Sequence, residues 1–148
     1  MTEIPLILLN LQNDGFHLLV EVTVFDKPFR AVLDTGASKT VFDKSSVENH
    51  IDPELIKLSD QLSTGLGTNT MESYTLTIPD FKIGDLHLRN YEAAVLDLST
   101  INIAYQQLDM EPVLGVIGGD LLYEYGAMIN YNTRVLTLNL PKELKEGS

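Results

Sequence analysis

The chain has 148 residues and no cysteine, so it can bury a core of its own and cannot contain a disulfide or a thiolate metal site. Its 44% of hydrophobic residues is typical of a globular protein. A formal net charge of -11 argues against a nucleic-acid partner, because binding to the phosphate backbone depends on clustered Lys and Arg.

No repeat, low-complexity stretch or linker divides the sequence, which predicts one domain over residues 1–148. The early apolar run at residues 4–9 is much shorter than a membrane span, and Glu3 precedes it where a secretory signal carries positive charge. We therefore expect no membrane association and a cytoplasmic location.

The first third of the chain predicts three strands, at residues 6–11, 18–24 and 29–33. The turn signal Asn13-Asp14-Gly15 separates the first two, because Asp and Gly tolerate positive φ. Residues 18–24 alternate apolar and more polar positions, as a strand with one buried face does. The third strand leads directly into Asp34.

Later segments predict further strands and two short helices. Residues 82–88 and 91–96 are expected to form a hairpin, and residues 128–140 return to strand. Ser99 or Thr100 is expected to cap an added helix near residues 100–108, and a second helix at residues 119–125 ends before Gly126. The prediction is an all-β class, with a closed barrel, a short C-terminal helix and the added helix.

The motif that carries chemistry is Asp34-Thr35-Gly36. A buried strand precedes it, and an extended apolar pattern resumes at residues 40–42. A carboxylate at a strand end points outward from a rigid element, and Gly36 lets its own backbone N–H approach that carboxylate. The Thr35 hydroxyl can bond inward or across an interface. This framing favours Asp34 as a catalytic carboxylate over a structural residue of a turn.

A second segment makes the pattern more specific. The order is two apolar residues, Gly, a short helix and a returning strand, in Val116-Ile117-Gly118-Gly119-Asp120-Leu121-Leu122, Gly126 and Ile129-Asn130-Tyr131. Together with Asp34-Thr35-Gly36, this segment resembles the retropepsin-like aspartic peptidases, which include the retroviral proteases and single-domain bacterial relatives. The resemblance covers most of residues 16–140.

The resemblance implies a retropepsin-like barrel and a role for each matching position. Asp34 is the catalytic carboxylate. The residues expected to support the catalytic loop are Thr35, Gly36, Ala37 and Ser38 within it, and Ile117, Gly118 and Gly119 in the segment that crosses behind it. The residues expected to form a substrate flap, matched by composition alone, are Gly65, Leu66, Gly67 and Thr68.

One carboxylate is not enough for this chemistry, and the resemblance implies that a homodimer supplies two Asp34 side chains. Two carboxylates in such close proximity hold one proton between them, because ionising both would place two negative charges side by side. The ionised partner then activates a water, and the protonated partner donates to the scissile carbonyl oxygen of a peptide or unfolded protein. We expect aspartic endopeptidase activity. The apolar terminal segments at residues 4–9 and 135–140 are candidates for further interface, with pairing inside one barrel as the alternative.

Two other functions are compatible with the sequence. One is a catalytically silent retropepsin-fold module that binds peptides or mediates dimerisation. The other is a small monomeric β-barrel that binds a ligand inside and is indifferent to Asp34. The intact Asp-Thr-Gly motif favours the enzyme, because a retired site has no physical reason to keep two carboxylates that repel each other.

Other polar residues receive structural interpretations. Asp120 opens a short helix, where a carboxylate is expected to cap free N–H groups. His17, His50 and His87 lack the i, i+4 spacing of a metal site, and neither a metal nor a cofactor is expected. The Gly-rich segment at residues 65–67 lacks the strand-to-helix setting of a phosphate loop.

Overall fold

The computed structural model describes residues 1–11, 15–58, 63–64, 70–71 and 73–141. Most of its regular elements are strands, namely β1 (Thr2–Asn10), β2 (Phe16–Val24), β3 (Lys27–Leu33), β4 (Val41–Asp43), β5 (Lys57–Leu58), β6 (Ser63–Thr64), β7 (Thr70–Met71), β8 (Tyr74–Ile83), β9 (Leu86–Leu96), β10 (Gly115–Ile117), β11 (Met128–Asn130) and β12 (Val135–Leu138). The helices are short, namely α1 (Lys44–Glu48), the 3-10 turn η2 (Pro53–Leu55), α2 (Ser99–Gln107) and α3 (Gly119–Glu124).

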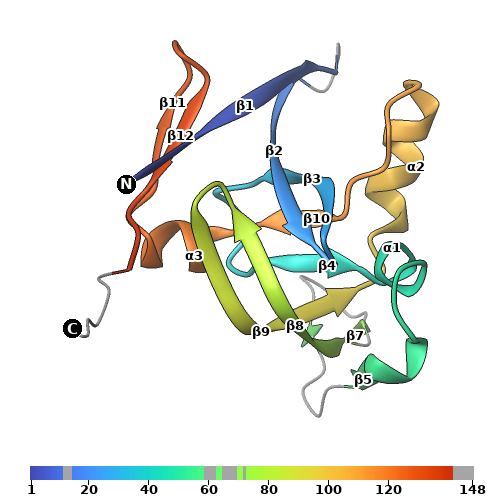
Figure 1. Cartoon of the computed structure of the whole chain (residues 1–148). Coiled ribbons are helices and arrows are strands. Elements are labelled where there is room, and N and C mark those ends of the chain that lie inside the picture. The colour runs from blue at the N-terminus through green and yellow to red at the C-terminus, as the bar shows by residue number, and fades with distance from the viewer. Residues whose placement is uncertain (12–14, 59–62, 65–69, 72, 142–148) are drawn as a thin grey trace, which may run out of the picture.

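A closed barrel forms the centre of the fold (Figure 1). Its strands follow the order β2-β3-β10-β4-β9-β8, and β8 closes the ring by pairing with the end of β2. The β10 strand lies between β3, to which it is parallel, and β4, to which it is antiparallel. The predicted all-β class and closed retropepsin-like barrel are confirmed.

The barrel interior holds the main apolar core. In β2, Val20, Val22 and Val24 are at most 1% exposed, whereas Glu21 between them faces solvent, as the alternating sequence predicts. Across the interior, the rings of Phe42 and Phe81 meet edge to face with centroids 5.4 Å apart. This core fixes the ends of β3 and β10, which lead into Asp34 and Gly118.

A second, smaller apolar cluster lies outside the barrel, against α2. Tyr105 of α2 is 1% exposed and packs with Leu19 of β2, Val32 of β3 and Val116 of β10. Asn102 joins the helix to the strand region: its amide donates to the Val113 carbonyl (3.1 Å) and accepts from the Val113 N–H (2.7 Å). The added helix expected near residues 100–108 is confirmed, and it covers the sheet next to β10.

Two local expectations are wrong. Leu98, not Ser99 or Thr100, occupies the N-cap position of α2, and the nearby side chain that accepts a backbone N–H is Asp97, from Ser99 (2.9 Å). The hairpin assigned to residues 82–88 and 91–96 turns earlier, at residues 84–85. The β9 strand then continues through Asn90, which adopts a positive φ of 51°.

The terminal strands pair within the chain. β1 pairs with β12 from Thr2↔Leu138 to Pro5↔Val135, and its second half pairs with β2. β11 lies at the outer edge of the resulting sheet (Figure 1). Pairing inside one chain, the alternative to an interface role, is therefore observed for these segments. Every helix in the described part of the chain is too short to cross a bilayer.

Candidate active site

Asp34 lies directly after β3, on a tight turn. Its backbone N–H donates to the carbonyl of Ile117 (3.0 Å), which extends the parallel pairing of β3 with β10 by one residue. Its carbonyl accepts from the N–H of Ala37 (3.1 Å) and closes the turn. The backbone of Asp34 is thus fixed on both sides while its side chain stays exposed.

Gly36 orients the carboxylate. Its N–H donates to Asp34 Oδ1 at 2.9 Å, so one carboxylate oxygen is held and Oδ2 has no hydrogen bond within the described part of the chain. A Cβ at position 36 would lie 3.3 Å from the same oxygen, tighter than most real Cβ contacts. Glycine therefore allows this close backbone approach, as its place in the motif predicts.

The segment at residues 117–119 braces the turn from behind. The N–H of Gly119 donates to the carbonyl of Ala37 at 2.6 Å. A Cβ on Gly118 would lie 2.5 Å from the carbonyl oxygen of Lys39 and 2.9 Å from that of Ala37. Only glycine lets the two backbones come this close. The structure thus brings residues 117–119 and the Asp34 turn together.

Asp120 lies at the start of α3 and its carboxylate accepts a backbone N–H of the first turn, as the sequence predicts. The N-cap residue is Gly118, and Asp120 lies in the first turn of the helix. Asp120 Oδ1 accepts from the Thr40 N–H (2.9 Å), the Thr40 hydroxyl (2.8 Å) and the Leu121 N–H (2.8 Å). The carboxylate therefore joins α3 to the chain that follows the Asp34 turn.

Thr40 is a residue that the sequence analysis missed. It is 2% exposed, and its hydroxyl oxygen accepts from the Gly118 N–H (3.0 Å) while it donates to Asp120. One hydroxyl thus satisfies a buried backbone donor and a carboxylate together. No local sequence pattern indicates this contact, because Thr40 and Asp120 are eighty residues apart in the chain.

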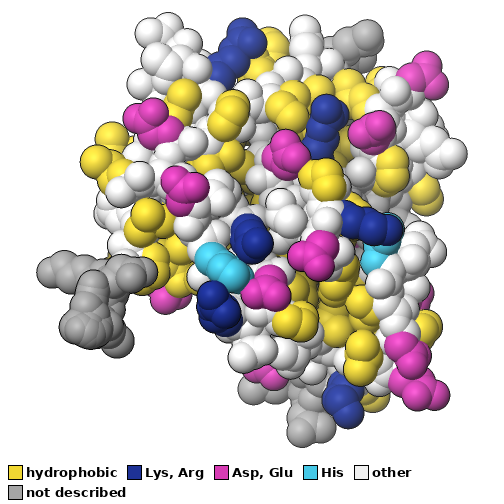
Figure 2. All heavy atoms as spheres, in the orientation of Figure 1, with side chains coloured by type: hydrophobic (Ala, Val, Ile, Leu, Met, Phe, Trp, Pro, Cys, Tyr) yellow, Lys and Arg dark blue, Asp and Glu magenta, His cyan; other side chains and the backbone are white. Residues whose placement is uncertain are grey.

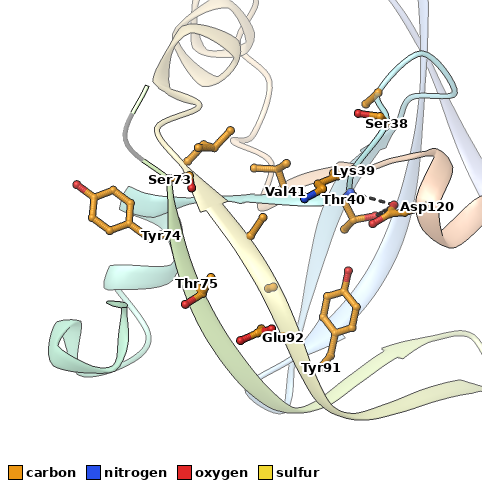
Figure 3. A pocket seen from close by; sticks show the side chains of 14 residues that line it. Ser38, Lys39, Thr40, Val41, Ser73, Tyr74, Thr75, Tyr91, Glu92 and Asp120 are labelled. Atoms are coloured by element: carbon orange, nitrogen blue, oxygen red, sulfur yellow. Dashed lines mark hydrogen bonds between the residues drawn. The ribbon is translucent and has the colours of Figure 1, made fainter. Parts of the chain in front are cut away.

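Tyr91 of β9 extends toward Thr40 and Asp120 (Figure 3). Burial raises the pKa of its phenol to about 12, and the negative charge of Asp120 acts in the same direction. The Tyr91 hydroxyl is therefore neutral throughout the physiological pH range.

A depression of about 790 Å³ opens beside the Asp34 turn (Figure 3). One wall is the chain after Asp34, at residues 37–41, and the other consists of residues from β8 and β9. Both carboxylates Glu92 and Asp120 and the amine of Lys39 belong to its lining.

The remaining predicted residues are placed as follows. Thr35 and Ser38 are exposed on the turn, and Ala37 is partly exposed. The expected flap residues Gly65, Leu66, Gly67 and Thr68 lie outside the described part of the chain.

Each histidine has a structural neighbour. His17 Nδ1 lies 2.8 Å from the Tyr105 hydroxyl, and His87 Nε2 lies 2.6 Å from Asp80 Oδ1. The His50 ring meets Phe29 edge to face at 4.9 Å. Among the described residues, no three His, Asp or Glu side chains are grouped so that they could hold a metal ion.

Comparisons with known proteins identify a family. Residues 20–121, more than half of the chain, match the model of a family described as aspartyl protease. No curated protein sequence matches the chain.

Solved structures show a similar fold. A retropepsin-like aspartic protease from Rickettsia conorii is 22% identical, with a TM-score of 0.56 over 95% of this chain and 93% of that one. The retroviral protease-like domain of Ddi1 from Leishmania major is 17% identical, with a TM-score of 0.58 over 82% of this chain and 87% of that one.

Proposed function

The chain belongs to the aspartyl protease family, and on that premise we propose that it is an aspartic endopeptidase that works as a homodimer, with Asp34 of both subunits in one site. The observation that carries the proposal is the arrangement of Asp34. Its carboxylate is exposed and accepts a hydrogen bond from Gly36 through one oxygen, and its backbone N–H is bonded to β10. Preorganisation of this kind is what a catalytic group needs.

A second chain is required because the described residues of one chain place no second Asp-Thr-Gly turn beside the first. The exposed residues Asp34 and Thr35 can meet their counterparts across a two-fold axis without unfolding anything. Two carboxylates in contact would share one proton, since ionising both places like charges side by side.

The shared proton defines the chemistry. A water held between the carboxylates gives a proton to the ionised one as its oxygen attacks the scissile carbonyl carbon. The protonated carboxyl donates its proton to the carbonyl oxygen, which yields a tetrahedral diol. Collapse of the diol breaks the C–N bond, and the amine leaves with a proton from the same pair. No covalent intermediate forms, and the substrate is a peptide or an unfolded chain.

Asp34→Asn tests the proposal directly. The amide is nearly the size of the carboxylate and can still accept from Gly36, but it cannot act as a general base. We expect the rate of peptide cleavage to fall by roughly a hundredfold to ten-thousandfold or more, since this range is the usual contribution of one acid–base group. The fold and the dimer should persist. Cleavage of a peptide library, read by mass spectrometry, measures the loss.

Asp85→Asn is the matched control. Asp85 is exposed in the β8–β9 turn, so the same chemical change there removes one charge and should leave cleavage unchanged. Full activity in Asp34→Asn would mean that another group does the chemistry. Peptide binding without cleavage by the wild type would support a silent binding module instead.

A further inference from the structure

We propose that Thr40 is a positioning residue for the reaction: its hydroxyl fixes the peptide group that holds the Asp34 turn, and so sets how closely the two carboxylates of a dimer approach each other. This inference rests on the proposed peptidase function and assigns a further residue to the same site. Thr40 is 2% exposed, so it acts through the backbone of its neighbours rather than by touching a substrate.

The peptide group between Ile117 and Gly118 has a hydrogen bond at each end. Its carbonyl oxygen accepts from the Asp34 N–H at 3.0 Å, and its N–H donates to the Thr40 hydroxyl oxygen at 3.0 Å. A peptide group is planar and rigid, so its oxygen and its N–H rotate together. The Thr40 contact therefore limits the rotation of the group that provides the acceptor for Asp34.

Asp120 fixes the direction of the Thr40 hydroxyl. The hydroxyl donates its only proton to Asp120 Oδ1 at 2.8 Å, which leaves its lone pairs for the Gly118 N–H. The same carboxylate oxygen accepts from the Thr40 N–H at 2.9 Å and from the Leu121 N–H at 2.8 Å. Figure 3 shows Tyr91 pointing toward this pair from β9. The hydroxyl is thus held as an acceptor at one position.

The Asp34 turn is attached to this segment at two points. Its first residue bonds to the peptide group described above, and the carbonyl of Ala37 at its end accepts from the Gly119 N–H at 2.6 Å. Gly118, between the two points, is buried. An unpaired buried N–H is costly, so without the Thr40 hydroxyl the segment would shift to find another acceptor. Both attachments of the Asp34 turn would move with it.

The spacing of the two Asp34 carboxylates decides how strongly they share a proton. Like charges that lie close together titrate in two separated steps, and the separation of these steps shrinks as the charges move apart. A bell-shaped pH profile of cleavage reports the two steps as its limbs. A looser Asp34 turn should therefore narrow the bell. A substitution that only lowers stability should leave the bell of the folded enzyme unchanged.

The test compares wild type with Thr40→Val, which replaces the hydroxyl by a methyl group of similar size, and with Thr40→Ser, which keeps the hydroxyl. Neither substitution changes a charge, and both retain the titratable groups beside Thr40, which are Lys39, Asp120 and Tyr91. The assay follows the best-cleaved peptide of a library across acidic and neutral pH.

We expect Thr40→Val to lower kcat by roughly tenfold to a hundredfold, since a misplacement of about 1 Å can cost a hundredfold. KM should change little, and the bell should narrow. Thr40→Ser should restore both kcat and the width of the bell. Thr77→Val makes the same chemical change at an exposed position of β8 and should match wild type.

Melting temperature and dimer mass show whether Thr40→Val is folded and dimeric. If it is not, Asp120→Ala takes its place, with Asp120→Asn as its control. Both remove the charge, but the asparagine amide keeps an oxygen that can accept from the Thr40 hydroxyl. The bell should therefore be narrower in Asp120→Ala than in Asp120→Asn.

Three results would overturn the role of Thr40 and leave the proposed function standing. They are a bell of wild-type width in Thr40→Val at any rate of cleavage, Thr40→Ser as impaired as Thr40→Val, and equal widths in the two Asp120 variants where these replace Thr40→Val. If wild type cleaves no peptide of the library, the proposed function itself fails, and the role of Thr40 with it.

Discussion

Close backbone contact decides which residues are tolerated beside the Asp34 turn. At Gly118 a methyl group would lie 2.5 Å from the Lys39 carbonyl oxygen, and neither backbone segment is a flexible side chain that can swing aside. At Gly119 the corresponding distance to the Ala37 carbonyl oxygen is 3.3 Å, which a shift of a few tenths of an ångström relieves. Two adjacent glycines therefore carry different constraints.

We predict that Gly118→Ala destabilises the protein by ~1–3 kcal/mol, the usual cost of overpacking, and lowers kcat/KM by moving the Asp34 turn. Gly119→Ala serves as the comparison and should cost less in both measurements. Urea denaturation and peptide cleavage on the same samples check the prediction. Equal effects at the two positions would show that the close approach to Lys39 is not the constraint.

Tyr91 makes stability depend on alkaline pH. Burial is the main reason that its pKa in the folded protein, about 12, lies above the ordinary phenol value of 10.0. The unfolded chain therefore loses the phenolic proton first as pH rises, so the stabilising contribution is complete below pH 10.0 and is lost between there and about pH 12.

We predict that Tyr91→Phe flattens the fall in unfolding free energy across this window. The phenylalanine ring keeps the packing but has no proton to lose. The free energy of unfolding, measured by denaturant titration at several pH values from 9 to 12, checks it. A decline as steep in Tyr91→Phe as in wild type would assign the alkaline loss to other groups.

At the scale of elements, α2 is held by polar contacts as well as by its apolar face. Asn102 bonds to both backbone groups of Val113 and lies 3.3 Å from Asp43 Oδ2. Asp43 is 2% exposed, and its carboxylate also accepts from the N–H groups of Ser46 (3.2 Å) and Leu98 (2.9 Å). One buried carboxylate therefore joins the end of β4, α1 and the start of α2.

We predict that Asn102→Ala costs about 1–3 kcal/mol of unfolding free energy, because it leaves the N–H and carbonyl of Val113 without their partner. Gln106→Ala, at an exposed position of the same helix, should stay within about 0.5 kcal/mol of wild type. Denaturant unfolding of the three proteins measures the difference. Similar values for both variants would show that solvent replaces the Asn102 contacts.

Local patterns predicted the barrel strands because one row of side chains in each is buried, as in β2, and they predicted α3 because Gly126 ends it with a φ of 55°. They missed α1, a helix of 5 residues whose N-cap signal is Asp43 alone, since so short a helix has almost no period to detect. The polar joints, Thr40 with Asp120 and Asn102 with Val113, were beyond sequence reasoning. Both are set by tertiary proximity rather than by any local pattern.

At the scale of the whole molecule, charge opposes the proposed dimer. Each chain carries a formal charge of -11, so two chains together carry twice that, -22. On the face shown in Figure 2, acidic side chains lie among apolar and basic ones rather than in one patch. On this face the repulsion is therefore not concentrated in one patch, and repulsion between separated exposed charges is effectively screened by salt.

We predict that raising ionic strength from about 0.01 M to about 0.15 M tightens the dimer, because the screening length falls from about 30 Å to about 8 Å. A gain of up to roughly tenfold in dimer affinity, about 1.4 kcal/mol, is expected. Sedimentation at both salt concentrations measures it. Since each site needs two chains, specific activity should rise with protein concentration around the dissociation constant and then level off. A protein that stays monomeric from micromolar to millimolar concentration in moderate salt, with activity strictly proportional to concentration, would show that one chain acts alone and would remove the basis for a symmetric pair of Asp34 carboxylates.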